Sequence, residues 1–288
     1  MPNGEQARRD FSQDAQCPAF FPLFGCRARA LKGGVRTLKF KLTLAYDGTA
    51  WQGWQSQRSG LGVQDQVEAA LAKLFAAAPR VESSSRTDAG VHARGMVAHF
   101  EIPTDQFRMP PRHLVLAINA CLPEDIRVVS AVRVPASFHA RFDALGKQYR
   151  YRVWNDPVMN PLLRTQVWHV PRPLDLAAMQ EAAAHFPGRQ DFRAFTANRG
   201  DVLDDAVRTL NRCDIVRHGR ELTFVIEGGG FLYKMCRGIV GTLVQVGYGR
   251  FPAEEVRSML DGKDRRFAGM NAPAHGLILW KVSYSPKD

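Results

Sequence analysis

The chain is poor in cysteine and has no long apolar run, and each shortage excludes a class of protein. Its five cysteines are scattered, and none stands in a Cys-x-x-Cys pair. A structural zinc site therefore has little support, and the odd count fits a reducing cytoplasm better than a disulfide framework. No hydrophobic stretch is long enough to span a bilayer. Acidic residues at Glu5, Asp10 and Asp14 make the first residues a poor signal or transit peptide. We therefore expect a cytoplasmic protein without a membrane segment.

Acidic side chains are also in the minority, because 39 Lys and Arg face 28 Asp and Glu, a net charge of +11. A basic excess suits a polyanionic partner, since lysine and arginine displace the counterions condensed on phosphates. Many basic proteins, however, carry only solvated charge. Composition by itself therefore indicates a basic globular protein and leaves RNA binding as a hypothesis.

Apolar periodicity predicts an α+β protein. Alternating apolar residues predict strands over 38–46, 96–102, 126–134, 147–154, 207–218, 222–227 and 277–284. Helical spacing predicts helices over 62–77, 110–121, 174–186, 231–247 and 253–260. This order indicates two similar units of largely antiparallel sheet with helices on one face. We place an N-terminal domain at 38–145 and a C-terminal domain at 146–288. Residues 1–37 lack periodicity and are expected to be a disordered or irregular extension.

One polar stretch of small residues, 83–94, stands between the first predicted helix and the second predicted strand. Its single carboxylate, Asp88, is flanked by Arg86 and Arg94. Nearby cations favour the ionised form of a carboxylate, and Gly90 can adopt backbone angles closed to other residues. The simpler alternative is a capped turn in which Thr87 or Asp88 satisfies backbone donors.

Five motifs decide whether the stretch 83–94 is a functional loop or only a capped turn. They span about residues 38–284 and occur in the same order as in one known family. The run Arg86-Thr87-Asp88-Ala89-Gly90-Val91-His92 resembles the catalytic loop of the A-type tRNA pseudouridine synthases. The other four resemble further motifs of that family: Tyr46-Asp47-Gly48 with Gly53-Trp54-Gln55; Phe138-His139-Ala140-Arg141-Phe142 followed by Tyr149-Arg150-Tyr151; the stretch 231–247 with Met235 and Arg237; and Gly276-Leu277. Several long motifs in order are far more specific than one short pattern.

The resemblance implies the pseudouridine synthase fold, with both halves contributing to a central active-site cleft. It also implies isomerisation of uridine to pseudouridine in the anticodon stem-loop of tRNA, at positions 38, 39 and 40, by a homodimer. The reaction breaks the bond between base and sugar, turns the base and rejoins it through carbon. No redox change or group transfer occurs, so no cofactor is required.

The resemblance also assigns roles to individual residues. Asp88 is expected to be the nucleophile, and Arg237 its cationic partner, although Arg237 could instead contact phosphate. Tyr149 is expected to stack on the flipped base and is a possible proton acceptor, whereas core packing is the alternative for any strand aromatic. Two substrate-binding roles are weaker: Leu277 would pack on the far side of the base, and Arg86 would enter the vacated RNA stem.

Two histidines lie within the matched motifs, His92 and His139. Neither has a partner at metal-ligand spacing, so we expect hydrogen-bonding histidines and no metal. Two other functions stay open on the residues alone. A non-catalytic RNA-binding module would have no need of Asp88. A metal-dependent hydrolase would need further carboxylates or histidines in the loop of Asp88.

Overall fold

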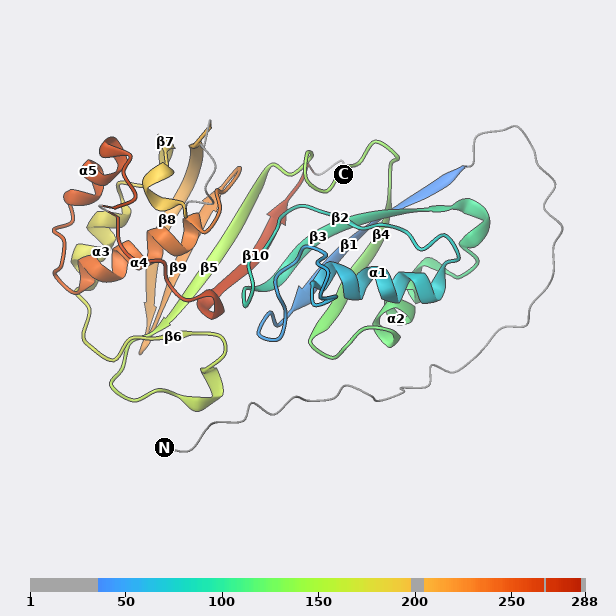
Figure 1. Cartoon of the computed structure of the whole chain (residues 1–288), viewed down its shortest axis with the longest axis horizontal. Coiled ribbons are helices and arrows are strands. Elements are labelled where there is room, and N and C mark those ends of the chain that lie inside the picture. Colours follow the sequence, from blue (N-terminus) through green and yellow to red (C-terminus); the bar gives the residue numbers. More distant parts are fainter. Residues whose placement is uncertain (1–35, 198–204, 267, 286–288) are drawn as a thin grey trace. The chain divides into compact units, whose positions relative to one another are not determined.

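A ten-stranded sheet forms the framework of this computed structural model, which describes residues 36–197, 205–266 and 268–285 (Figure 1). The predicted extension lies outside the described residues except for 36 and 37. The sheet order is β4 (Ile126–Val134), β1 (Thr37–Tyr46), β3 (His92–Pro103), β10 (Leu277–Ser283), β5 (Gly146–Trp154), β9 (Glu221–Gly228), β8 (Val207–His218) and β7 (Gly188–Asp191). Two short strands pair off this path, β2 (Glu82–Ser83) with β3 and β6 (Trp168–His169) with β5. Most neighbours are antiparallel, which confirms the predicted α+β class.

The last strand of the chain joins the two halves of the sheet. β10 runs parallel to β3, with Ile278 opposite His92, and antiparallel to β5, with Leu279 opposite Tyr149. The start of β3, just after Asp88, is thereby brought near the strand that carries Tyr149. The candidate site forms at this junction.

The helices pack against the sheet through apolar stripes. α1 (Val63–Leu74) and α2 (Pro111–Ala120) accompany the strands of the first half, and α3 (Leu176–Ala183), α4 (Met235–Gly247) and α5 (Glu255–Gly262) those of the second (Figure 1). Among the described residues, single 3₁₀ turns occur at Thr104–Gln106, Pro161–Leu163, Arg193–Phe195 and Ala274–Gly276. All five predicted helices are present. α4 starts four residues later than predicted, because Lys234 adopts a left-handed conformation with φ of 56°. α1 ends at Leu74, where Phe75 becomes extended.

Side chains alternate between two different faces along β5. Tyr149, Tyr151 and Val153 are buried in the core, whereas the residues between them are only partly covered. On that second face, the ring of Trp280 lies between Arg94 and Arg150, whose guanidinium carbons are 4.2 and 3.9 Å from its centroid. Because successive strand residues point to opposite sides, one strand supplies both the core and a basic outer surface.

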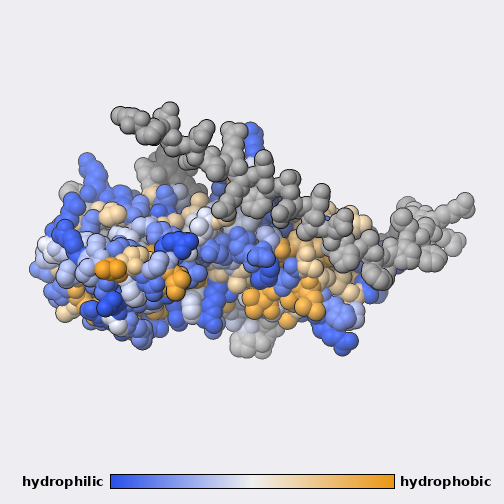
Figure 2. All heavy atoms as spheres, turned by 90° about the horizontal axis from the view of Figure 1, so that it is seen from below, coloured by the Kyte–Doolittle hydropathy of each residue, from blue (hydrophilic) through white to orange (hydrophobic). Residues whose placement is uncertain are grey.

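The surface is mostly polar. Figure 2 shows hydrophilic residues over most of the visible described surface, with apolar residues gathered mainly in the half that carries α1 and α2. On α2, the apolar side chain of Leu116 is 68% exposed. Within the described residues, no helix combines the length and apolarity needed to cross a membrane.

Candidate active site

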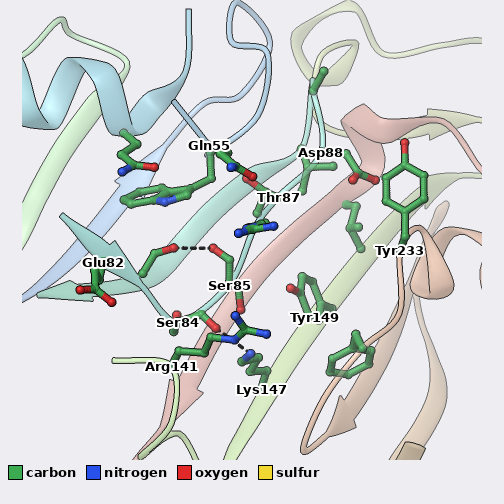
Figure 3. Close-up of a pocket in the computed structure, with 18 of the residues that line it drawn as sticks. Gln55, Glu82, Ser84, Ser85, Thr87, Asp88, Arg141, Lys147, Tyr149 and Tyr233 are labelled. Carbon is green, nitrogen blue, oxygen red and sulfur yellow. Dashed lines mark hydrogen bonds between the residues drawn. The ribbon is translucent and has the colours of Figure 1, made fainter. Parts of the chain in front are cut away.

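A cleft of about 1040 Å³ opens where the two halves of the sheet meet (Figure 3). Four of the five predicted site residues line it, namely Arg86, Asp88, Tyr149 and Leu277. The fifth, Arg237, reaches the cleft through Asp88, as the contacts below show. The cleft is large enough for a nucleotide and part of its neighbours, since small-ligand pockets measure about 300–1,000 Å³.

The loop of Asp88 is held by the turn that follows β1. The Trp54 amide donates to the Thr87 carbonyl at 3.1 Å, and the Gly90 amide donates to the Trp51 carbonyl at 3.2 Å. Gly53 makes this approach possible. It has φ of +90°, and a Cβ atom there would lie 2.4 Å from the Thr87 oxygen. The Gly53-Trp54 motif therefore holds the loop of Asp88 in place through its backbone.

His92 ties the other end of the loop to the second half of the chain. It is 4% exposed, and its Nδ1 accepts from the Gly48 amide at 3.0 Å. Its Nε2 lies 2.9 Å from the Thr165 carbonyl and 3.0 Å from the His275 carbonyl. These contacts use both ring nitrogens, as expected of a hydrogen-bonding histidine.

Asp88 and Arg237 form an ion pair across the junction. Arg237 Nη1 lies 3.3 Å from Asp88 Oδ2, and the two side chains are 14% and 22% exposed. Arg237 Nε also donates to the Ala272 carbonyl at 2.7 Å. The guanidinium thus donates to two different acceptors, and its interaction with the Asp88 carboxylate is not bidentate. Its position depends on the close approach of the 270–272 segment, because a Cβ at Gly241 would lie 1.7 Å from the Met270 oxygen.

The two tyrosines of β5 differ in what they face. Tyr149 lines the cleft, packs edge-on to Phe231 at 4.9 Å between centroids, and lies near Leu277 on the lining. Tyr151 does not line the cleft, and its hydroxyl donates to the Pro273 carbonyl at 2.8 Å. Burial raises the pKa of Tyr149 above its ordinary value, and the nearby Cys236 and Asp88 add to the rise. The Tyr149 phenol is therefore held neutral.

Several side chains that sequence reasoning did not assign to the cleft also line it, and three of them lie close together along the chain. They are Arg141 and Phe142, which follow β4, and Lys147 at the start of β5. Lys147 Nζ donates to the Ser84 carbonyl at 2.7 Å. Burial, together with a smaller effect of the neighbouring Arg141 charge, lowers the pKa of Lys147 to about 8. The resemblance of the Phe138–Phe142 motif to the family could have pointed to Arg141 and Phe142 as cleft residues. The motif did not show, however, which of its side chains face the cleft.

Glu82, His99 and His139 form the one cluster of metal-ligand types found among the described residues, with ligand atoms within 4.8 Å of one another. Residue spacing along the chain did not predict this cluster, because its three members come from β2, β3 and the segment after β4. His99 Nδ1 accepts from the Ala140 amide, and His139 Nδ1 accepts from the Arg141 and Phe142 amides. In neutral rings this leaves the proton on each Nε2, where a metal would need a lone pair. The cluster is arranged for hydrogen bonding, and Asp88 is not part of it.

Comparison with known proteins identifies the class to which this fold and cleft belong. The family model described as tRNA pseudouridine synthase matches residues 43–143 and 182–285. The chain belongs to the tRNA pseudouridine synthase family. It is 46% identical over 248 residues to the tRNA pseudouridine synthase A of Syntrophotalea carbinolica, which covers 86% of this chain and 97% of that protein. It is 45% identical over 247 residues to that of Anoxybacillus flavithermus, with 85% and 98% covered. It is 46% identical over 250 residues to that of Pelobacter propionicus, with 87% and 100% covered.

Proposed function

We propose that this protein is an isomerase that converts uridine to pseudouridine in tRNA, acting on the anticodon stem-loop at positions 38, 39 and 40. The family and the names of its relatives support the tRNA substrate and the reaction. The observation that carries the proposal of residue roles is the Asp88–Arg237 pair, 3.3 Å apart, at the cleft between the two halves.

Asp88 is the nucleophile in this proposal. A carboxylate attacks or stabilises positive charge only as the anion, and Arg237 supplies a cation beside it. The bond between base and sugar breaks, the base turns, and a carbon of the ring joins the sugar in place of the nitrogen. The proton on that carbon then leaves and the freed ring nitrogen takes up a proton, so the product is an isomer and no co-reactant is consumed. No residue role here needs a metal or a cofactor.

Tyr149 and Leu277 hold the detached base. A flipped base needs flat apolar surfaces on which to stack while it is free of the sugar. Tyr149 is 7% exposed and Leu277 is 6% exposed, and both line the cleft. The raised pKa of Tyr149 favours a neutral stacking phenol over a proton acceptor.

Arg86 contacts the RNA from the mouth of the cleft. It is exposed and lies two residues before Asp88 in the same loop. An arginine plane can stack and hydrogen-bond where a base has left the helix. The Arg86 side chain therefore occupies the place in the RNA stem that the flipped nucleotide leaves.

The decisive test is pseudouridine mapping on unmodified tRNA with Asp88→Asn and no added cofactor. We expect loss of product with nearly unchanged tRNA binding, because binding depends on many phosphate contacts. Asp214→Asn is the matched control, since Asp214 is a 52% exposed ion-pair carboxylate outside the cleft lining. Turnover by Asp88→Asn near the wild-type rate would overturn the nucleophile assignment.

We also propose that the protein acts in the cytoplasm as a homodimer. The scattered, odd cysteine count supports the reducing compartment, and the family resemblance supports the dimer. Light scattering on the purified chain tests the dimer, and a monomer mass at micromolar concentration would contradict it.

A further inference from the structure

Phe142 is an exposed aromatic residue on the wall of the active-site cleft. It is 75% exposed, yet it belongs to the cleft lining. Its segment follows β4 in a fixed turn, in which the His139 amide donates to Asp143 Oδ2 at 2.7 Å and the Asp143 amide donates to the His139 carbonyl at 3.1 Å. A large apolar side chain that is open to a polar cleft is a surface available for a ligand.

The ring of Phe142 is supported from behind by a fixed imidazole. The rings of Phe142 and His139 lie 4.2 Å apart with an interplanar angle of 35°. His139 Nε2 lies 2.9 Å from Glu82 Oε2, and its Nδ1 accepts from the Arg141 and Phe142 amides at 3.1 and 3.3 Å. His99 packs edge-on against the same imidazole, 4.9 Å away. The aromatic platform is thus ordered before any ligand arrives, which lowers the entropic cost of stacking on it.

Two cations stand beside this platform. Figure 3 shows Arg141 and Lys147 with their charged ends close to each other near Ser84, on the opposite side of Tyr149 from Asp88. Within the described ranges, no carboxylate lies in ion-pair distance of either side chain, and Lys147 instead donates to the neutral Ser84 carbonyl. Two adjacent cations that lack a counter-charge in a cleft favour an anionic ligand.

We propose that Phe142, Arg141 and Lys147 form a subsite for one nucleotide that flanks the target uridine, with its base stacked on Phe142 and its phosphate held by the two cations. Bases of single-stranded loops unstack readily and are commonly bound on aromatic side chains, while their phosphates meet lysine and arginine. The subsite rests on the proposed function, because it assumes an RNA whose target nucleotide enters the pocket of Asp88 and Tyr149. It adds a second, separately placed contact to that RNA.

The protein side of the test uses Phe142→Ala and Phe142→Trp with an unmodified tRNA transcript. We expect Phe142→Ala to weaken equilibrium binding and raise KM by about 5- to 150-fold, the range for loss of one base stack, with the single-turnover rate at saturation little changed. Phe142→Trp should retain binding because it keeps the flat surface. Leu145→Ala is the matched control, since Leu145 is 67% exposed nearby but lies outside the cleft lining.

The RNA side replaces, one at a time, the nucleotides on either side of the target by abasic residues. At one of these positions, the abasic RNA should bind the wild type as weakly as intact RNA binds Phe142→Ala, and combining the two changes should cause no further loss. Arg141→Gln and Lys147→Gln should each lower the slope of log affinity against log salt by about one, whereas Phe142→Ala should leave it unchanged.

Wild-type affinity of Phe142→Ala, or additive losses at both flanking positions, overturns the subsite. An unchanged salt slope in both Arg141→Gln and Lys147→Gln overturns its phosphate contact. Binding is measured without turnover, so these outcomes are separate from failure of the proposed function, which would appear as a wild-type protein that binds tRNA and forms no pseudouridine.

Discussion

Replacing Arg237 by lysine tests the ion pair at the centre of the proposed mechanism. The Arg237 guanidinium donates from Nη1 toward Asp88 and from Nε to the Ala272 carbonyl. A lysine ammonium is a compact point donor and cannot keep the planar fork that spans both acceptors. We therefore expect one of the two contacts to be lost. A hydrogen bond to a charged group contributes about 1.5–3 kcal/mol, which corresponds to roughly a 10- to 150-fold fall in the rate of the chemical step.

Arg237→Ala should be more damaging, because it leaves Asp88 without its cation. Breaking a buried pair costs about 3–5 kcal/mol. Asp88 keeps 22% of its side chain exposed, so water offsets part of that cost, and we expect the lower end, about 3 kcal/mol or roughly 150-fold. The measurement is single-turnover formation of pseudouridine at saturating enzyme, together with the Tm of each variant.

Arg152→Lys is the matched control for this experiment. Arg152 is 22% exposed, and its Nε and Nη2 contact both carboxylate oxygens of Glu221 at 2.7 and 2.8 Å, away from the cleft lining. We expect it to lower Tm without slowing turnover. The reasoning fails if Arg237→Lys reacts at the wild-type rate but binds tRNA more weakly with a salt slope reduced by about one, since that pattern describes a phosphate contact.

Three further predictions concern the walls of the cleft. Tyr149→Phe should form product within about tenfold of the wild-type rate while Tyr149→Leu should be far slower, because a buried phenol with a raised pKa acts by stacking and not as a base. Gly53→Ala should lower the unfolding free energy by about 1–3 kcal/mol in denaturant titrations and slow turnover more than it weakens binding, since it strains the backbone that holds the loop. Affinity for tRNA should fall as pH rises through about 8, where Lys147 loses its proton, and Lys147→Arg should abolish that fall; the charge that acts on Lys147 is that of Arg141.

Each of these has a clear contrary result. A loss of about 100-fold or more in Tyr149→Phe would show that the hydroxyl takes part in proton transfer. Wild-type stability and turnover in Gly53→Ala would show that the loop tolerates displacement. A pH profile that is unaltered in Lys147→Arg would exclude Lys147 as the titrating contact.

The sequence by itself determined the kinds of elements and their approximate bounds. Alternation over 126–134 predicted β4 at its observed bounds, and alternation over 147–154 predicted β5, which begins one residue earlier, at Gly146. These features are local, because side-chain direction follows directly from the period of the backbone. Boundaries that depend on a single backbone angle, such as the left-handed Lys234 before α4, were not readable from periodicity.

Only the tertiary structure decided which of these faces meet. The insertion of β10 between β3 and β5 brings Asp88 to Arg237, which is 149 residues away in sequence. The same packing places Glu82, His99 and His139 in one cluster and opens the platform at Phe142 to the cleft. Residue spacing could not predict these neighbours, since strand order and the crossing of distant segments depend on the packing of the whole sheet and not on any local period.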